Sequence, residues 1–207
     1  MYARSTTMQG NPQMIDQVIA YVRDQVMPMV EGMEGYVGIS MICDRETGRC
    51  IATTTWDSAE AMRASSERVQ ASRAQAAEMM GGASLDVQEW EVVAMHRTRD
   101  TPQDGAVRLI WARGEQGQLD RIVDAWRMTI PPQLEQMPGF CAVSVLADRD
   151  TMRAVSAVSY ESREMMDRSA DQALTLRDRF AATMGFDITD VEEYDVVLAH
   201  LRIPEMV

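Results

Sequence analysis

The sequence predicts an α+β fold in which a unit of strand, helix, strand, strand, helix and strand occurs twice in tandem. The first observation is that the chain matches itself when it is shifted by 104 positions, without any insertion, so that CDRETGRC meets ADRDTMRA. The second is that each half alternates between segments with the apolar spacing of strands and segments with that of helices. An internal duplication explains both observations.

Each copy begins with a short strand and a helix. YARSTTM opens the first copy and AVRLIWAR opens the second, and both have the alternation of a strand. Apolar residues then recur at helical spacing over residues 15–26 and 119–130, which indicates one amphipathic helix per copy. Pro28 and Pro132 should end or kink these helices, because proline removes a helical hydrogen bond.

A hairpin, a second helix and a last strand complete each copy. GYVGISMI and CIATTTW flank the turn DRETGR, and GFCAVSVL and AVSAVSY flank DRDTMR. A helix with a weak apolar stripe and the strands VQEWEVVAMH or VEEYDVVLAH follow. This order defines a ferredoxin-like βαββαβ unit, whose helices leave one face of the sheet uncovered. We therefore expect two ferredoxin-like repeats, packed sheet to sheet as an intrachain (pseudo-dimeric) α+β barrel. The repeats span residues 1–97 and 106–207, and residues 98–105, TRDTPQDG, link them.

Composition limits the functions that the chain can have. With 207 residues and 46% hydrophobic content it can bury a core, and a net charge of −12 repels nucleic acid and anionic lipid. There is no apolar run of about 18 to 20 residues and no secretory signal, so we expect a cytoplasmic protein without a membrane or nucleic-acid partner. Cys43 and Cys50 flank the hairpin turn and can face each other, but a reducing compartment favours free thiols. The cysteine spacing predicts no metal site.

Each half resembles the antibiotic biosynthesis monooxygenase (ABM) domain of the dimeric α+β barrel superfamily. The resemblance rests on EGY and PGF before the second strand, on TTTWDSAEAM and SAVSYESREMM before the second helix, and on EWEVV and EYDVV in the last strand. It implies a barrel made of two domains and a cofactor-independent oxidation of a small aromatic or quinol-like substrate between sheet and helices. No nucleotide, flavin or metal motif such as GxGxxG or HExxH occurs.

The resemblance also includes a haem-degrading branch, which uses a tryptophan and a histidine on the second helix. The expected tryptophan positions hold Ser65 and Ser169. The histidine positions fall near Arg73-Ala74 and Arg177-Asp178. Because this ligand set is absent from both copies, we expect no cofactor, and haem degradation ranks low.

Four residues at matched positions are candidates for catalysis. His96 and His200 end the equivalent last strands and could act as general bases or haem ligands, although an inherited structural histidine is the favoured interpretation. Arg4 and Arg108 lie on the equivalent first strands, where a guanidinium could hold an anionic or phenolate oxygen. The alternative for these arginines is a solvated position at a strand end.

Substrate-binding candidates are bulky apolar residues, which could instead belong to the core: Trp56, Tyr160, Met62, Met80 and Trp111. Trp111 stands opposite Thr7 and should fill space in the second copy that stays open in the first. We therefore expect at most one well-formed pocket, in the N-terminal copy, where many of the methionines lie.

Three functions follow from these observations. The favoured one is a cofactor-independent monooxygenase acting on a small aromatic or quinol-like substrate, which predicts a pocket with a base or an anion-stabilising group. The second is a non-catalytic binding protein for an apolar metabolite or for haem, which predicts a pocket without paired polar groups. The third is a structural or interaction protein whose barrel is filled by its own side chains. A further homodimer of the intrachain pair is left open.

Overall fold

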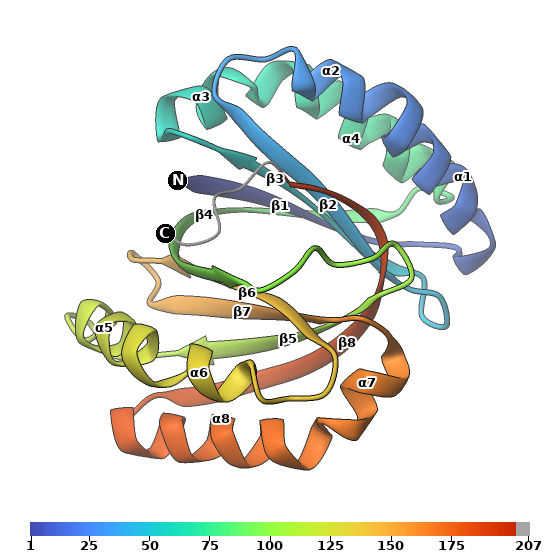
Figure 1. Ribbon diagram of the computed structural model, residues 1–207. Coiled ribbons are helices and arrows are strands. Elements are labelled where there is room, and N and C mark those ends of the chain that lie inside the picture. The colour runs from blue at the N-terminus through green and yellow to red at the C-terminus, as the bar shows by residue number, and fades with distance from the viewer. Residues whose placement is uncertain (202–207) are drawn as a thin grey trace. The chain divides into compact units, whose positions relative to one another are not determined.

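The computed structural model describes residues 1–201 of the chain, and the predicted order of elements occurs in it twice (Figure 1). The first copy consists of β1 (Tyr2–Gln9), η1 (Pro12–Met14), α1 (Ile15–Tyr21), η2 (Val22–Val26), α2 (Met27–Glu31), β2 (Tyr36–Asp44), β3 (Arg49–Trp56), α3 (Ala59–Ala64), α4 (Ser66–Met79) and β4 (Ser84–Arg97). The second consists of β5 (Ala106–Arg113), α5 (Leu119–Thr129), α6 (Pro131–Leu134), β6 (Phe140–Asp148), β7 (Arg153–Tyr160), α7 (Arg163–Arg168), α8 (Ala170–Met184) and β8 (Asp187–Leu201).

The strands follow the hydrogen-bonded order of a closed barrel, β1-β3-β2-β8-β5-β7-β6-β4. Within each copy the last strand lies beside the first, which gives the order β4-β1-β3-β2 and, in the second copy, β8-β5-β7-β6. This is the order of a ferredoxin-like sheet. The prediction of an α+β barrel built from two ferredoxin-like repeats is confirmed.

The chain forms two compact units that do not coincide with the two sequence copies. Of the described residues, the first unit contains Met1–Trp90 and 196–201, and the second contains Glu91–Asp195. The long strands β4 and β8 therefore each contribute to both units. Residues 91–97 of β4 pair with β6, and residues 187–195 of β8 pair with β5, both inside the second unit.

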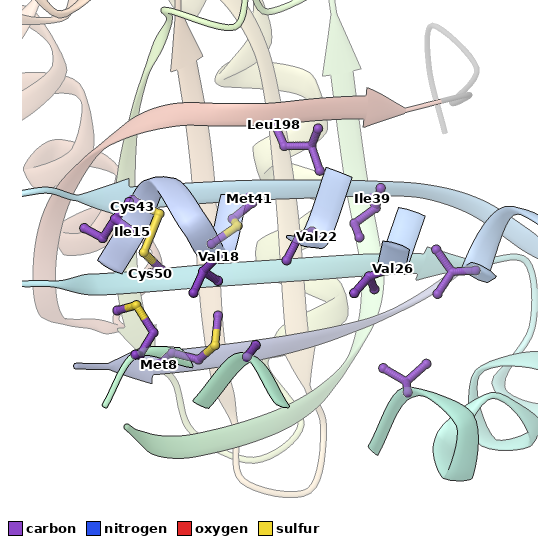
Figure 2. Close-up of a cluster of buried hydrophobic side chains, with 14 of the residues drawn as sticks. Met8, Ile15, Val18, Val22, Val26, Ile39, Met41, Cys43, Cys50 and Leu198 are labelled. Atoms are coloured by element: carbon purple, nitrogen blue, oxygen red, sulfur yellow. A yellow bond between two sulfur atoms is a disulfide. The ribbon is translucent and has the colours of Figure 1, made fainter. Parts of the chain in front are cut away.

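In the first unit, α1 to α4 cover one face of the sheet (Figure 1). The core beneath them is rich in sulfur, and Figure 2 shows Met8, Met41, Cys43 and Cys50 within it. Cys43 and Cys50 lie directly opposite each other on β2 and β3 and form a buried disulfide. The prediction of free thiols is wrong, because the hairpin register brings the two sulfurs together.

In the second unit, α5 to α8 cover the sheet of β5, β6 and β7 (Figure 1). Its core has more aromatic and branched side chains than sulfur, including Trp126, Phe140, Tyr160 and Leu176. No helix among residues 1–201 is both long enough and apolar enough to span a membrane.

The two histidines make equivalent contacts. His96 Nε2 lies 2.7 Å from Glu135 Oε1, and His200 Nε2 lies 2.8 Å from Glu31 Oε1. Glu31 and Glu135 occupy equivalent positions under the 104-residue shift. Each histidine therefore contacts the equivalent glutamate, and that glutamate belongs to the other sequence copy. The His96 ring also stacks on Phe140. This repeated contact follows from the duplication and gives both histidines a structural partner.

Candidate functional site

A cavity of ≈ 120 Å³ lies between the sheet and the helices of the second unit. Its walls come mainly from β5, β6, β7, α5 and α8, and most of them are aliphatic or aromatic. The polar residues of its lining are Arg108, Ser156, Tyr160 and Arg177. An apolar hollow with a small number of polar groups is the usual form of a small-molecule site.

The corresponding space in the first unit is only ≈ 40 Å³. Sulfur-containing side chains of the first copy are replaced by smaller ones in the second, in the pairs Met8 and Ala112, Met41 and Val145, and Cys50 and Ala154. Ala112, Val145 and Ala154 all line the larger cavity. The prediction of a pocket in the N-terminal copy is therefore wrong, because its methionines and its disulfide fill the space that they were expected to surround.

Trp111 does not fill the second copy, because it points away from the cavity. Side chains alternate along a strand, and Arg108 and Ala112 of β5 line the cavity, whereas Trp111 is on the other face. Its indole Nε1 donates to Glu192 Oε2 at 2.6 Å, and Arg153 lies over the ring at 5.8 Å from the centroid. The expected effect of this tryptophan on the pocket depended on the wrong face of the strand.

At ~24 cal/mol per Å³, a closed cavity of ≈ 120 Å³ costs about 3 kcal/mol of stability, and this is an upper bound for a cavity with an open mouth. The equivalent space of the first unit is only ≈ 40 Å³, so the same fold accommodates either a filled or an open space at this position.

Arg108 is the charged group deepest in this site, with 6% of its surface exposed. Its Nε and Nη2 donate to Glu193 Oε1 at 2.9 and 2.7 Å, and Nη2 also donates to the Met166 carbonyl at 3.3 Å. Its Cζ lies 5.8 Å from the centroid of the Tyr160 ring. Nη1 is buried and has no hydrogen-bond partner among residues 1–201. A buried donor without a partner costs about 1–3 kcal/mol, so this nitrogen is ready to bind an acceptor.

Arg4, the equivalent residue of the first copy, has no such unused nitrogen. Its Nη1 donates to Ser65 Oγ at 2.9 Å, its Nη2 donates to the Met62 carbonyl at 2.8 Å, and Glu89 Oε1 accepts from both Nε and Nη2. In the second copy the equivalent serine, Ser169, donates to the Met166 carbonyl, and Arg108 Nη1 does not reach it. Arg4 thus uses both terminal nitrogens within the protein, whereas Arg108 Nη1 has no partner within residues 1–201.

Tyr160 lies beside Arg108 and is fully buried. Burial raises the pKa of its hydroxyl, while hydrogen bonding with Ser169, the charge of Arg108 and hydrogen bonding with Arg108 act in the opposite direction. The hydroxyl therefore stays protonated at neutral pH and can donate a hydrogen bond. In the first copy the equivalent Trp56 is also buried, and its Nε1 donates to Thr54 Oγ1 at 3.2 Å.

The structure brings two of the sequence-predicted site residues, Arg108 and Tyr160, to one cavity. Met62 and Met80 belong to the core of the first unit and line neither of the two cavities. His96 and His200 line neither of them as well. Arg177 was not among the predicted site residues, although its position matches an arginine of the first copy.

The barrel order, the duplicated βαββαβ unit and the ligand-sized cavity define an α+β barrel protein of the ABM class. The model of the Antibiotic biosynthesis monooxygenase family matches residues 1–77. The chain belongs to this family. Its relatives include uncharacterized protein Rv2557 of Mycobacterium tuberculosis (strain H37Rv), which is 43% identical over 207 residues, covering 100% of this chain and 92% of that protein. Uncharacterized protein Rv2558 of the same strain is 42% identical over 208 residues, covering 100% of this chain and 88% of that protein.

Solved structures share the fold over nearly the whole chain. A proposed monooxygenase from Lactobacillus acidophilus NCFM superposes with a TM-score of 0.69 and 11% identity, covering 97% of this chain and 96% of that one. An anthrone oxidase-like protein superposes with a TM-score of 0.65 and 14% identity, covering 99% of this chain and 94% of that one. The heme-degrading enzyme LmHde from Listeria monocytogenes superposes with a TM-score of 0.55 and 9% identity, covering 94% of this chain and 99% of that one. At these identities the likeness is one of fold.

Proposed function

We propose that this protein binds a small phenol- or quinol-like aromatic molecule as its anion in the cavity of the second copy, and oxidises it with dioxygen as a cofactor-independent monooxygenase. The observation that carries the proposal is Nη1 of Arg108, a buried nitrogen without a hydrogen-bond partner within residues 1–201, in a cavity whose walls are mostly apolar. A guanidinium in such surroundings stabilises an oxyanion much more than it would in water. Tyr160 lines the same cavity beside Arg108, and its hydroxyl donates to Met137 Sδ at 3.9 Å.

The size of the cavity limits the ligand. A cavity of ~150 Å³ lined by apolar side chains holds one benzene molecule. The ≈ 120 Å³ found here therefore encloses about one aromatic ring, and a second ring must lie in the mouth. A haem macrocycle is much larger, and Ser169 at the expected tryptophan position donates to the Met166 carbonyl. Small phenols and quinols fit the site better than haem.

The chemistry requires an electron-rich anion and a dry site. Once its hydroxyl has lost a proton, a phenol or hydroquinone donates electron density to dioxygen, and the apolar walls keep water from the reacting carbon. For a phenol such as 1-naphthol, the hydroxyl hydrogen and the hydrogen of the ring carbon opposite it leave with one oxygen atom of dioxygen as water, and the other oxygen atom becomes the second carbonyl of the quinone. Arg108 lowers the pKa of the bound phenol by stabilising its anion, and the proton leaves to solvent through the mouth.

Binding without oxidation is a second candidate function. The observation that favours it is that the cavity lining described here contains neither a carboxylate nor an imidazole that could serve as a base. In that case Arg108 and Tyr160 hold the ligand, and no dioxygen is consumed.

Oxygen uptake distinguishes the two functions. An oxygen electrode is used with 1,4-dihydroxynaphthalene and with 1-naphthol, and the rate of uptake is compared with the rate without protein. Arg108→Gln should abolish the protein-dependent uptake, and Arg4→Gln, the matched change in the first copy, should leave it unchanged. Ligand binding without protein-dependent uptake would show that the protein is a binding protein.

A further inference from the structure

We propose that the ligand of this cavity carries a carboxylate as well as a phenolic oxygen, and that Arg177 binds this carboxylate. The inference rests on the proposed function, since it concerns the other end of a molecule whose phenolic end lies at Arg108. It identifies Arg177 as a specificity-determining residue and the ligand as a hydroxyaryl carboxylic acid.

Arg177 lies on α8 and is the second cation in the cavity wall. Its side chain is 20% exposed, and its Nε donates to Asp178 Oδ1 at 2.8 Å. Within residues 1–201 this is the hydrogen bond that its guanidinium makes, so both terminal nitrogens can bind an acceptor. The Asp178 side chain is 57% exposed, which leaves much of its charge to solvent.

The first copy shows a different position for the same side chain. Arg73, which matches Arg177, folds back along its own helix, where Nε donates to the Val69 carbonyl and Nη2 to the Ser66 carbonyl, both at 3.4 Å. Burial lowers the pKa of Arg73, and the charge of Arg4 lowers it further, so the two guanidinium groups lie within electrostatic reach of each other. In the second copy Arg177 is turned away from its helix carbonyls toward Asp178. Arg177 therefore lines the cavity while its Nε pairs with Asp178 instead of with helix carbonyls.

The separation of the two arginines sets the length of the ligand. Arg108 donates to the Met166 carbonyl on α7, and this carbonyl also accepts from Ser169, the residue that caps the start of α8. Arg177 lies eight residues beyond Ser169, which corresponds to about 12 Å along a helix, and helical side chains lean back toward the N-terminus and shorten this distance. Polar groups at opposite ends of two fused rings match this separation better than groups on a single ring.

Local charge is needed because the whole protein repels anions. The net charge of −12 disfavours any carboxylate that approaches the surface. A cation beside the carboxylate favours binding of a carboxylic acid over its neutral ester. The cavity holds two cations, Arg108 and Arg177, so the change in this preference in Arg177→Gln, compared with Arg108→Gln, reports on Arg177.

The test measures binding of 6-hydroxy-2-naphthoate and of its methyl ester by isothermal titration calorimetry at pH 7. Wild type should bind the acid more tightly than the ester. Arg177→Gln should weaken binding of the acid about tenfold, the loss expected for one charge-assisted contact, and change binding of the ester less than twofold. Arg177→Lys should retain part of the preference for the acid, and Arg73→Gln, the matched change in the first copy, should alter neither affinity. Thermal unfolding confirms that each variant is folded.

The inference and the proposed function fail in different ways. If Arg177→Gln leaves the acid-to-ester ratio unchanged while Arg108→Gln weakens both ligands, the second anion site is wrong and the phenol site stands. If Arg108→Gln changes neither affinity, or if wild type binds neither compound, both proposals are wrong.

Discussion

The clearest test of why the second copy is hollow is to exchange one pair of equivalent residues. Ala112→Met places a side chain like that of Met8 in the cavity, and Met8→Ala makes the opposite change in the first copy. Filling a cavity of ≈ 120 Å³ can recover at most about 3 kcal/mol, and ordering a methionine side chain opposes this by about 1.5–2 kcal/mol. We therefore expect Ala112→Met to stabilise the protein by about 1 kcal/mol while it abolishes ligand binding. Met8 is 2% exposed, and its truncation should destabilise the protein by about 2–5 kcal/mol.

Thermal unfolding followed by circular dichroism measures the first effect, and calorimetry with 6-hydroxy-2-naphthoate measures the second. For a chain of this size a gain of about 1 kcal/mol raises Tm by about 2–4 °C. A variant that gains stability and loses its ligand shows that the open space serves binding. If Ala112→Met binds the naphthoate as wild type does, or if it unfolds at a lower temperature, the cavity is not the site that we describe.

Three further predictions follow from the same contacts. Arg4→Gln should lower the free energy of unfolding by about 2–3 kcal/mol, because it removes charge-assisted bonds that are all satisfied, and Arg108→Gln should lower it by about 1 kcal/mol less; urea titration of both variants decides this. Burial raises the pKa of the Cys141 thiol to about 11, so a thiol reagent at pH 8 should label no cysteine in the native protein, one after unfolding, and three once the Cys43–Cys50 disulfide is also reduced. The pKa of Tyr160 is higher in the folded than in the unfolded protein, so its contribution to stability is complete below about pH 10 and is lost as pH rises through the folded value; Tyr160→Phe should reduce the loss of stability measured by urea titration between pH 9 and 11.

Much of the fold follows from periodicity. The segment predicted as the first strand of the second copy, AVRLIWAR, is β5 from end to end, and YARSTTM accounts for all but one residue at the end of β1. Alternating apolar residues define a strand locally, and the duplication supplies a second instance of each element. The exchange of β4 and β8 between the compact units depends on pairing between distant strands, which local patterns do not encode.

The site was harder to predict, because its volume is a sum over many side chains. The signal was present in the sequence, since Met8 meets Ala112 in the internal comparison, but Trp111 in the neighbouring position suggested the opposite conclusion. Assigning the correct face to β5 would have required knowing that Arg108 faces the helices, since residues two and four positions further then do so as well. A single error of strand face moved the expected pocket into the wrong copy.

The internal duplication makes the protein its own control. Arg4 and Arg108 occupy the same position of the same fold and both bind a glutamate of the last strand, so the difference between them lies in their surroundings. In the first copy a serine takes the remaining nitrogen and sulfur side chains fill the space. In the second copy the equivalents of Met8, Met41 and Cys50 are smaller, the cavity is larger, and Arg108 Nη1 has no partner within residues 1–201. The proposed ligand accounts for both differences at once, because its ring would pack in the open space and its oxygen would accept from the nitrogen.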